Sequence, residues 1–502
     1  MDVLNYLYTG FQVCFQPVNL FLAFIGCVIG TLVGVLPGLG PAAAISLLLP
    51  TSFHITPVGA LILLSAIYYG AMYGGSTTSI LVNMPGEAAS VVTCLDGYEM
   101  AKRGRAGPAL GISAMGSFIA GTAGVVGLML VAPPLAEVAL SFGPPEYTTL
   151  MILGLVVVTF LVKGSMPKAL LTAAFGMFLS TIGLDAVSGA ARFSFDRVEL
   201  MDGIGMVPVV MGLFGISEVL LNLEKTFERE ILTGEIKDYL PTREDWRKST
   251  LPILRGSLMG FFLGILPGGG AVLASFVSYA VEKRISKYPH MFGKGAIEGV
   301  AAPEAANNSA TAGAFIPLLT LGIPANVVMA ILLGAMMIHG ITPGPNLIHE
   351  HPQVFWGVII SMYIGNAMLL VLNLPLIGLW VQVLKVPYRL LFPLILLFCL
   401  IGAYSLNFAT FDILIMNVFG IIGYLMKKTD YEGAPLILAL VLGNLFENAL
   451  RQSLMLSDGS FRIFFNRPIA AVFIWAAIAL LVLPLLPWLK KRRPAVGVEA
   501  ED

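Results

Sequence analysis

Long apolar runs separated by short polar segments dominate the pattern along this chain. Clear runs cover residues 58–82, 107–132, 147–162, 357–381, 390–404 and 468–488. A helix needs about 20 apolar residues to cross the hydrocarbon core of a bilayer. Within that core, only helices and closed barrels satisfy every backbone polar group. The pattern therefore predicts an all-α polytopic membrane protein with roughly 11–13 membrane segments, some of them interrupted.

Two of the apolar runs are near copies, and each is broken in its middle by proline and glycine. GTLVGVLPGLGPAAA begins at Gly30 and GFFLGILPGGGAVLA begins at Gly260, with seven identical positions at a constant offset of 230. Paired broken segments in two halves of a membrane protein are typical of transporters and point to the binding site. We therefore expect two structural repeats, and we favour an inverted arrangement of them with broken helices or re-entrant hairpins.

The two breaks are the first candidate site. Proline cannot continue a helix cleanly, and glycine lets the backbone turn and approach a ligand closely. The half-helices that start near Pro41 and Ala271 would present free N–H groups, which suit an anion. A kinked helix or a tight helical hairpin without a ligand is the alternative. The predicted substrate-binding residues here are Pro37, Gly38, Gly40, Pro267, Gly268, Gly269 and Gly270.

A hydroxyl-rich stretch inside an apolar run is the second candidate. Ser76, Thr77 and Thr78 follow a Gly-Gly pair, and we expect them to add hydroxyl donors to a substrate. Small hydroxyl residues also pack helices together in membranes, which is the competing interpretation. Another Pro-Gly break follows, and Glu87 at its end is interpreted as a loop residue, a helix cap or a cation ligand.

A third stretch, PEAANNSATAG, aligns with the second at an offset of 239, which pairs Gly74 with Gly313 and Pro85 with Pro324. Spacings of three and four residues place a carboxylate and two amides on one helix face. Oxygen ligands of this kind suit Na⁺, and ionisable residues inside a membrane suggest function. A polar loop outside the hydrocarbon is the alternative. We expect substrate contacts from Asn307, Asn308 and Ser309, and cation contacts from Glu304, Asn308, Thr311 and Thr320.

Composition and charge fit this membrane assignment. Hydrophobic residues make up 57% of the chain and charged residues 12%, with a net charge of −1 and a mean hydropathy of +0.86, whereas soluble domains carry about 25% charged residues. Clusters of Lys and Arg mark cytoplasmic loops and place the C-terminus inside. The expected divisions are a first transmembrane half (1–222), a polar cytoplasmic connector (223–250), a second half with C-terminal helices (251–489) and a cytoplasmic tail (490–502).

Other chemistry has little support in the sequence. The phosphate-loop pattern GxxxxGK[ST] and the hydrolase patterns GxSxG and HExxH do not occur, which argues against an enzyme. The chain has no basic surface pattern for nucleic acid. Its four scattered cysteines are expected to be buried thiols, and we expect no cofactor and no metal beyond the coupling Na⁺. Glu447 and Arg451 have the spacing of an ion pair along a helix.

Together, these motifs strongly resemble one family. GTLVGVLPGLGPAAAISLLLP, YGGSTTSILVNMPGE, DGYEMAKRGRAGPALG, GILPGGGAVLASFVSYAVEK and GVAAPEAANNSATAGAFIPLLTLGIPAN resemble the large membrane subunit, TctA, of the tripartite tricarboxylate transporters, over about residues 19–448. The resemblance implies a secondary carrier of the bacterial inner membrane that takes up small carboxylates with a coupling cation. It also implies two partners, a small four-helix membrane subunit and a periplasmic solute-binding protein. A stand-alone symporter or exchanger and a membrane enzyme are the alternative functions.

Overall fold

The computed structural model describes residues 3–36, 40–161, 165–185, 187–224, 239–268, 270–384 and 388–482. Its regular structure is almost entirely helical, as the apolar pattern predicts. Across these ranges the only sheet is a two-stranded antiparallel hairpin, β1 (Gly183–Leu184) and β2 (Ala191–Arg192). Half of the expected connector, residues 225–238, lies outside the described residues, and its last part forms the beginning of α12 (Arg243–Ile265).

Within the described ranges, eight helices are long and apolar enough to cross a membrane, and they make this chain a multi-pass membrane protein. They are α2 (Pro17–Val35), α4 (Pro57–Val82), α7 (Ala106–Ala139), α8 (Pro144–Leu161), the continuous segment Met206–Glu224 formed by α10 (Met206–Val210), η5 (Met211–Ile216) and α11 (Ser217–Glu224), α18 (Pro352–Asn373), α21 (Thr410–Lys428) and α22 (Ala434–Met455). Shorter apolar helices are α9 (Met166–Ser180), α16 (Val327–Ile338), the part Phe392–Ser405 of α20 (Tyr388–Asn407) and α24 (Pro468–Val482).

The remaining helices connect these segments or form the broken ones. They are α1 (Val3–Cys14), α3 (Pro41–Leu48), η1 (Pro50–His54), η2 (Ala88–Ser90), α5 (Val91–Thr93), η3 (Cys94–Tyr98), α6 (Glu99–Lys102), η4 (Val198–Leu200), α12 (Arg243–Ile265), α13 (Gly270–Ile285), η6 (Pro289–Met291), α14 (Glu298–Gly313), α15 (Phe315–Leu321), α17 (Leu347–Glu350), α19 (Ile377–Val383) and α23 (Ile463–Asn466).

Two helices form the buried centre of the molecule. Every residue of α4 from Gly59 to Val82 is buried, and so is every residue of α14 from Gly299 to Gly313. A helix that is buried all round is normally apolar all round. Both of these helices instead carry hydroxyl, amide or carboxyl side chains, so their polar groups must find partners inside the protein.

Glycine stripes bring α2 against α4 and α12 against α14. Side chains at Gly26, Gly30 and Gly34 would overlap the backbone carbonyls of α4, and those at Gly256, Gly260 and Gly264 would overlap α14 at Ala302, Ala306 and Ala310. Small residues at every fourth position let two helix backbones approach closely in a membrane. The stripes occupy equivalent positions at the offset of 230 that the sequence repeat shows.

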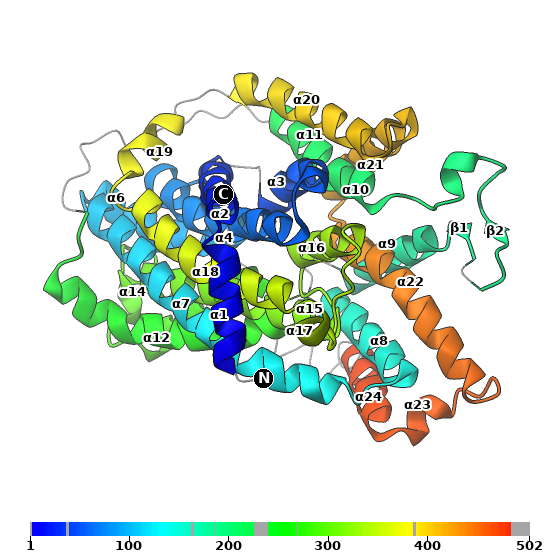
Figure 1. The fold of residues 1–502 in the computed structure, drawn as a ribbon. Helices are drawn as coiled ribbons and strands as arrows, with labels where there is room; N and C mark the ends of the chain where they lie inside the picture. The colour runs from blue at the N-terminus through cyan, green and yellow to red at the C-terminus, as the bar shows by residue number, and fades with distance from the viewer. Residues whose placement is uncertain are drawn as a thin grey trace.

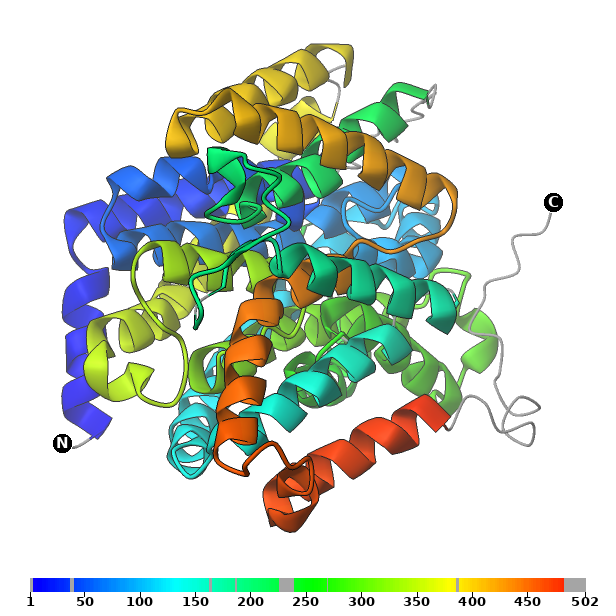
Figure 2. The same ribbon diagram turned by 90° about the vertical axis from the view of Figure 1, so that its right-hand side faces the viewer.

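The outer helices face away from this centre. Figures 1 and 2 show α20 and α21 at one edge and α24 at the opposite edge. These helices expose large apolar side chains, including Phe398, Ile421 and Trp475. Exposed apolar surface of this extent is normal for helices that contact lipid. The polar residues of α4 and α14 are thus enclosed by apolar helices.

A network of charged side chains ties the β1–β2 hairpin to α22. Arg451 lies 2.6 Å from Asp185 and 2.6 Å from Glu447, and Arg192 lies 2.7 Å from Glu447. The predicted ion pair between Glu447 and Arg451 is therefore confirmed. The hydrogen bond from Arg451, with those from the backbone amides of Ser188 and Val187, holds the pKa of Asp185 well below its usual range. The network fixes the hairpin beside α9 and α22.

Candidate functional site

The first break (residues 36–40) separates α2 from α3. Helix α2 ends at Val35 and α3 begins at Pro41, where the sequence predicted that a half-helix would start. Proline at the first helical position suits its fixed φ angle and its missing N–H. Gly40 has open space where a side chain would stand. Pro37 and Gly38, two of the predicted substrate-binding residues, lie outside the described residues.

The second break (residues 266–269) separates α12 from α13 in the same way. Helix α12 ends at Ile265, and α13 begins at Gly270, one residue from the predicted start. Gly268 has a φ angle of +80°, which only glycine adopts at low cost, and its N–H donates to the carbonyl of Ala325 over 2.7 Å. Pro267 is within the turn, and Gly269 lies outside the described residues.

Two further interruptions close α4 and α15. Asn83 (φ 56°) and Gly322 (φ 69°) end these helices in the left-handed conformation, and a proline follows two residues later in each case. We call residues 83–87 the Glu87 turn and residues 322–326 the Asn326 turn. The prolines prevent both helices from continuing. Asn83 and Pro85 are exposed in the Glu87 turn, whereas residues 322–325 of the Asn326 turn are buried.

Each turn ends on a polar side chain that caps the next helix. Glu87 accepts a hydrogen bond of 2.7 Å from the N–H of Ala89 at the start of η2. Asn326 accepts one of 3.0 Å from the N–H of Met329 at the start of α16. Such caps satisfy N–H groups that lack a partner within the helix. Of the three interpretations of Glu87, the cap is therefore confirmed.

The capping residues also bind the central helices. Asn307 of α14 donates from Nδ2 to Glu87 Oε1 over 3.3 Å, and Asn326 donates from Nδ2 to Tyr68 Oη of α4 over 3.1 Å. Thr311 donates to the carbonyl of Asn307 over 3.0 Å and its hydroxyl also faces that of Tyr68. These five side chains form one polar path from the Glu87 turn to the Asn326 turn.

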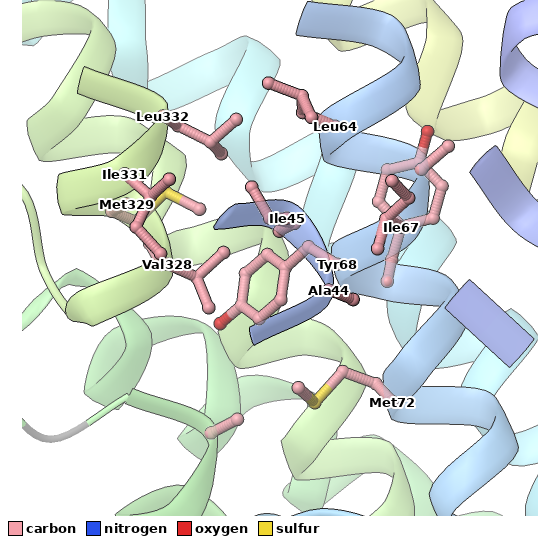
Figure 3. Packing of buried hydrophobic residues seen from close by; sticks show 14 of the residues in the cluster. Ala44, Ile45, Leu64, Ile67, Tyr68, Met72, Val328, Met329, Ile331 and Leu332 are labelled. Atoms are coloured by element: carbon pink, nitrogen blue, oxygen red, sulfur yellow. The ribbon is translucent and has the colours of Figure 1, made fainter. Parts of the chain in front are cut away.

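Tyr68 reaches this path from within an apolar cluster. Figure 3 shows its ring among Ala44 and Ile45 of α3 and Val328 of α16, and all four residues are buried. The packing fixes the ring, so that its hydroxyl is held beside Asn326. The position of this hydroxyl is therefore set by α3 and α4, which are neighbours in the sequence, and by the distant α16.

Glu304 lies on a second face of α14 and collects hydroxyl groups from three other segments. Ser76 of α4 donates to its Oε2 over 2.5 Å, Thr93 of α5 donates to its Oε1, and Ser113 of α7 lies beside it as a third partner. A carboxylate in a buried site is stabilised by several such donors. Among the described residues, no Lys, Arg or His forms an ion pair with Glu304 or with Glu87.

Most of the remaining predicted substrate- and cation-binding residues form hydrogen bonds within the protein. Thr78 donates to the carbonyl of Val35, Thr320 donates to that of Ile316, and Asn308 donates to Ser117 over 2.7 Å. Thr77 is buried, and the buried hydroxyl of Ser309 has no hydrogen-bond partner. The structure thus brings Asn307 and Thr311 to the polar path, while Ser76, Asn308 and Glu304 meet on the neighbouring face of α14.

Sequence reasoning gave no role to Tyr68 or Asn326, and it left the role of Glu87 open. A signal for all three was present in the offset of 239, which pairs Tyr68 with Asn307 and Glu87 with Asn326. The hydrogen bond between Asn307 and Glu87 and the one between Asn326 and Tyr68 therefore join pairs of positions that this offset relates to each other.

Asp96 was also missed, although it is the buried anchor of the loop before α14. Its Oδ1 accepts from the N–H groups of Gly293, Gly295 and Ala296 over 2.7–2.9 Å, and Tyr279 donates to its Oδ2 over 2.9 Å. Four donors on one carboxylate hold this loop tightly against η3. Asp96 therefore sets where α14 begins.

Two hollows of about 700 Å³ each lie beside this centre, and Met337 at the end of α16 lines both. One extends along Arg192, Asp202 and Asn444, and the other reaches Gly322 of the Asn326 turn. Ligand pockets typically measure about 300–1,000 Å³. The second hollow is thus large enough for a small organic acid and reaches the first residue of the Asn326 turn.

Comparisons with known proteins cover the same residues. The family model described as the tripartite tricarboxylate transporter TctA family matches residues 20–438, which include both breaks and both turns. An uncharacterized 52.8 kDa protein of Agrobacterium vitis, from the TAR-I ttuC' 3' region, is 50% identical over 501 residues and 100% of both chains. An uncharacterized protein from the TAR-II ttuC' 3' region of the same organism is 53% identical over 240 residues, which are 48% of this chain and 99% of that protein. No solved structure matches the chain.

Proposed function

Because the chain belongs to the tripartite tricarboxylate transporter TctA family, we propose that it is the carrier subunit for Na⁺-coupled uptake of small di- or tricarboxylates across the bacterial inner membrane. In this role it works with a small four-helix membrane subunit, and a periplasmic binding protein delivers the substrate. The family is one of transporters and not of enzymes, in agreement with the absence of catalytic motifs from the sequence.

The proposed architecture is an inverted repeat of two halves with the site between them. Equivalent helices make equivalent contacts: α14 packs on α7 as α4 packs on α18, and α13 packs on η2 as α3 packs on α16. The two central helices run antiparallel, because Ser76 meets Glu304 while Tyr68 meets Thr311. Broken helices that meet at a repeat interface are the usual location of a transporter's binding site.

The substrate carboxylate is proposed to bind where α13 begins. Asn326 faces Gly270 at this point, since a Cβ atom on Gly270 would lie 3.6 Å from Asn326 Nδ2. The free N–H groups of the α13 N-terminus, the Asn326 amide and the Tyr68 hydroxyl are neutral donors of the kind that bind a carboxylate. Together with the first break, they would hold an anion without a Lys or Arg side chain.

Transport would follow from alternate exposure of this site to the two sides of the membrane. One bundle would move against the other around the fixed pairs between the halves, as in other carriers built from repeats. The hollow that reaches Gly322 would be the approach from one side. This step rests on analogy at the level of the fold.

The observation that carries the proposal is the hydrogen bond between Asn326 and Tyr68, which joins the two halves at the start of α13. Its test is uptake of ¹⁴C-labelled citrate, malate and succinate by cells that express this chain with its partner subunits. Tyr68→Phe and Asn326→Ala each remove a donor to the substrate. A hydrogen bond to a charged group contributes about 1.5–3 kcal/mol, so KM should rise about tenfold or more.

Tyr363→Phe is the matched control for this test, because its hydroxyl donates only to the sulfur of Met129. Uptake by that variant should equal that of the wild type. If Tyr68→Phe and Asn326→Ala both kept the wild-type KM at normal membrane abundance, the proposed substrate site would be wrong. A stand-alone symporter is the alternative function, and undiminished uptake after deletion of the binding-protein gene would favour it.

A further inference from the structure

The carboxylate of Glu87 is buried where several chain segments meet. Its residue is 7% exposed, Oε2 accepts from the N–H of Ala89, and Oε1 accepts from Asn307 at a long 3.3 Å. No basic side chain pairs with it among the described residues. An unpaired carboxylate in a membrane interior is costly unless a proton or a cation neutralises it. Glu87 therefore needs a proton or a bound cation at this point.

A second acceptor belongs to the amide group that bonds this carboxylate. The side-chain oxygen Oδ1 of Asn307 has no hydrogen-bond partner, and its residue is fully buried. It belongs to the same amide group whose nitrogen bonds Glu87. Buried amide oxygens nearly always have a hydrogen-bond donor or another bound group, so an oxygen without a donor is open to a cation.

The end of α2 adds further negative potential at the same place. A side chain on Gly86 would overlap the carbonyl oxygen of Gly34, and the Cα atom of Gly75 is also in contact there, so three backbone segments converge next to Glu87. Gly34 is in the last turn of α2, where carbonyl groups lack helical partners and carry the negative end of the helix dipole. Backbone carbonyls at the end of a broken helix commonly coordinate Na⁺ in carriers.

We propose that Glu87 and the amide oxygen of Asn307 bind Na⁺ between the end of α2 and the start of η2. This inference deepens the proposed function and rests on it, because it assigns the coupling cation to a defined site. The sequence placed this role on Glu304, whose two oxygens already accept hydroxyl donors from Ser76 and Thr93. Glu87 has the open acceptor beside it that Glu304 lacks.

This site joins the cation to the substrate through one helix. Asn307 lies one turn before Thr311 on α14, and Thr311 bonds the Asn307 carbonyl while facing the Tyr68 hydroxyl. A Na⁺ ion that orients the Asn307 amide therefore also fixes the segment that presents Thr311 and Tyr68. Occupancy of the cation site would thus organise the site for the carboxylate.

The test measures Na⁺ binding on the purified protein and does not require transport. Thermal unfolding is followed at fixed pH 8 while NaCl replaces KCl at constant ionic strength. Binding to the folded state raises the melting temperature with ligand concentration, so the wild type should show a Na⁺-specific rise. Glu87→Gln, which keeps an oxygen for the Ala89 cap, should abolish the rise. Asn307→Ala should weaken Na⁺ binding about tenfold or more.

Ser278→Ala is the matched control, because Ser278 is a buried hydroxyl residue of α13 that donates to the carbonyl of Ser275 on its own helix. It should keep the full response to Na⁺. A Na⁺-specific rise that survives in Glu87→Gln, or a wild type that responds to pH but not to Na⁺, would overturn the inference. If Glu87→Gln does not fold, the response of Asn307→Ala decides. Carboxylate uptake is measured alongside and is a separate test of the proposed function. Uptake that persists without Na⁺ binding would contradict only the inference.

Discussion

Glu304 is the residue on which the hydroxyl groups of the molecular centre converge. Ser76, Thr93 and Ser113 reach it from three different segments, and the residue is 1% exposed. A carboxylate can accept all of these donors, whereas a neutral amide of the same shape offers one oxygen and one NH₂ group. Glu304 therefore holds α4, α5 and α7 against α14, and this structural role is separate from cation binding at Glu87.

Glu304→Gln should lower the stability of the protein by about 2–3 kcal/mol, since it leaves a buried donor facing another donor. The measurement is thermal unfolding of the purified variant in KCl. Thr320→Val is the control, because the Thr320 hydroxyl bonds only a carbonyl of its own helix, and its effect should stay near zero. If Glu304→Gln kept the wild-type stability but lost the Na⁺-specific rise in melting temperature, the cation site would lie at Glu304 instead of Glu87.

At this scale, the sequence could predict that α14 carries functional polar groups, because carboxylate and amide residues are rare in a membrane interior. It could not predict which groups meet. Glu87 and Asn307 are 220 positions apart, and their contact depends on how the two halves pack. Asn326 looked like an ordinary residue after a proline, and Tyr68 like an ordinary aromatic residue in an apolar run.

Helix α2 meets α4, and α12 meets α14, through close backbone contact along the glycine stripes. The glycine stripe on α12 lies directly on Ala302, Ala306 and Ala310 of α14. This contact keeps the second break close to the polar path, because α12 ends where the break begins. The sequence predicted both breaks from their Pro-Gly motifs, but the role of the preceding glycines in helix packing depends on which helix lies opposite.

Gly260→Ala should therefore destabilise the protein, because the new Cβ atom would lie 2.7 Å from Ala306 Cα and force the two helices apart. Overpacking of this kind costs about 1–3 kcal/mol. The expected result is a lower melting temperature and lower membrane abundance. Gly378→Ala introduces the same methyl group where nothing lies within 4 Å and should change neither quantity. Equal stability of the two variants would contradict the proposed close packing.

On the scale of the whole molecule, the arrangement of helices supports a definite orientation in the membrane. Basic clusters precede α7 and follow α13 and α21, whereas the β1–β2 hairpin and the loop before α18 are at the opposite ends of their helices. Cytoplasmic loops carry an excess of Lys and Arg. We therefore propose that the hairpin lies in the periplasm and that the basic loops and the C-terminal tail lie in the cytoplasm.

A cysteine introduced at an exposed position on each side tests this orientation. A maleimide that cannot cross the membrane should label Glu199→Cys, next to the hairpin, in intact spheroplasts. It should label Lys287→Cys only after the membrane is permeabilised. The native chain, in which three of the four cysteines are buried, provides the background. Labelling of Lys287→Cys in intact spheroplasts would reverse the orientation and would assign the hairpin to the cytoplasm.

The central claim is that one polar path on α14 couples Na⁺ at Glu87 to a carboxylate at Asn326. Thr311 is the link between the two ends, and Thr311→Val removes its hydroxyl with little change in volume.

The most direct test is the KM for carboxylate uptake into membrane vesicles, measured at several Na⁺ concentrations and a fixed membrane potential. Coupling of about 1.4 kcal/mol corresponds to a tenfold change in affinity. In the wild type, saturating Na⁺ should lower KM about tenfold, and in Thr311→Val the KM should hardly depend on Na⁺. A Thr311→Val variant with the wild-type dependence of KM on Na⁺ would contradict the account.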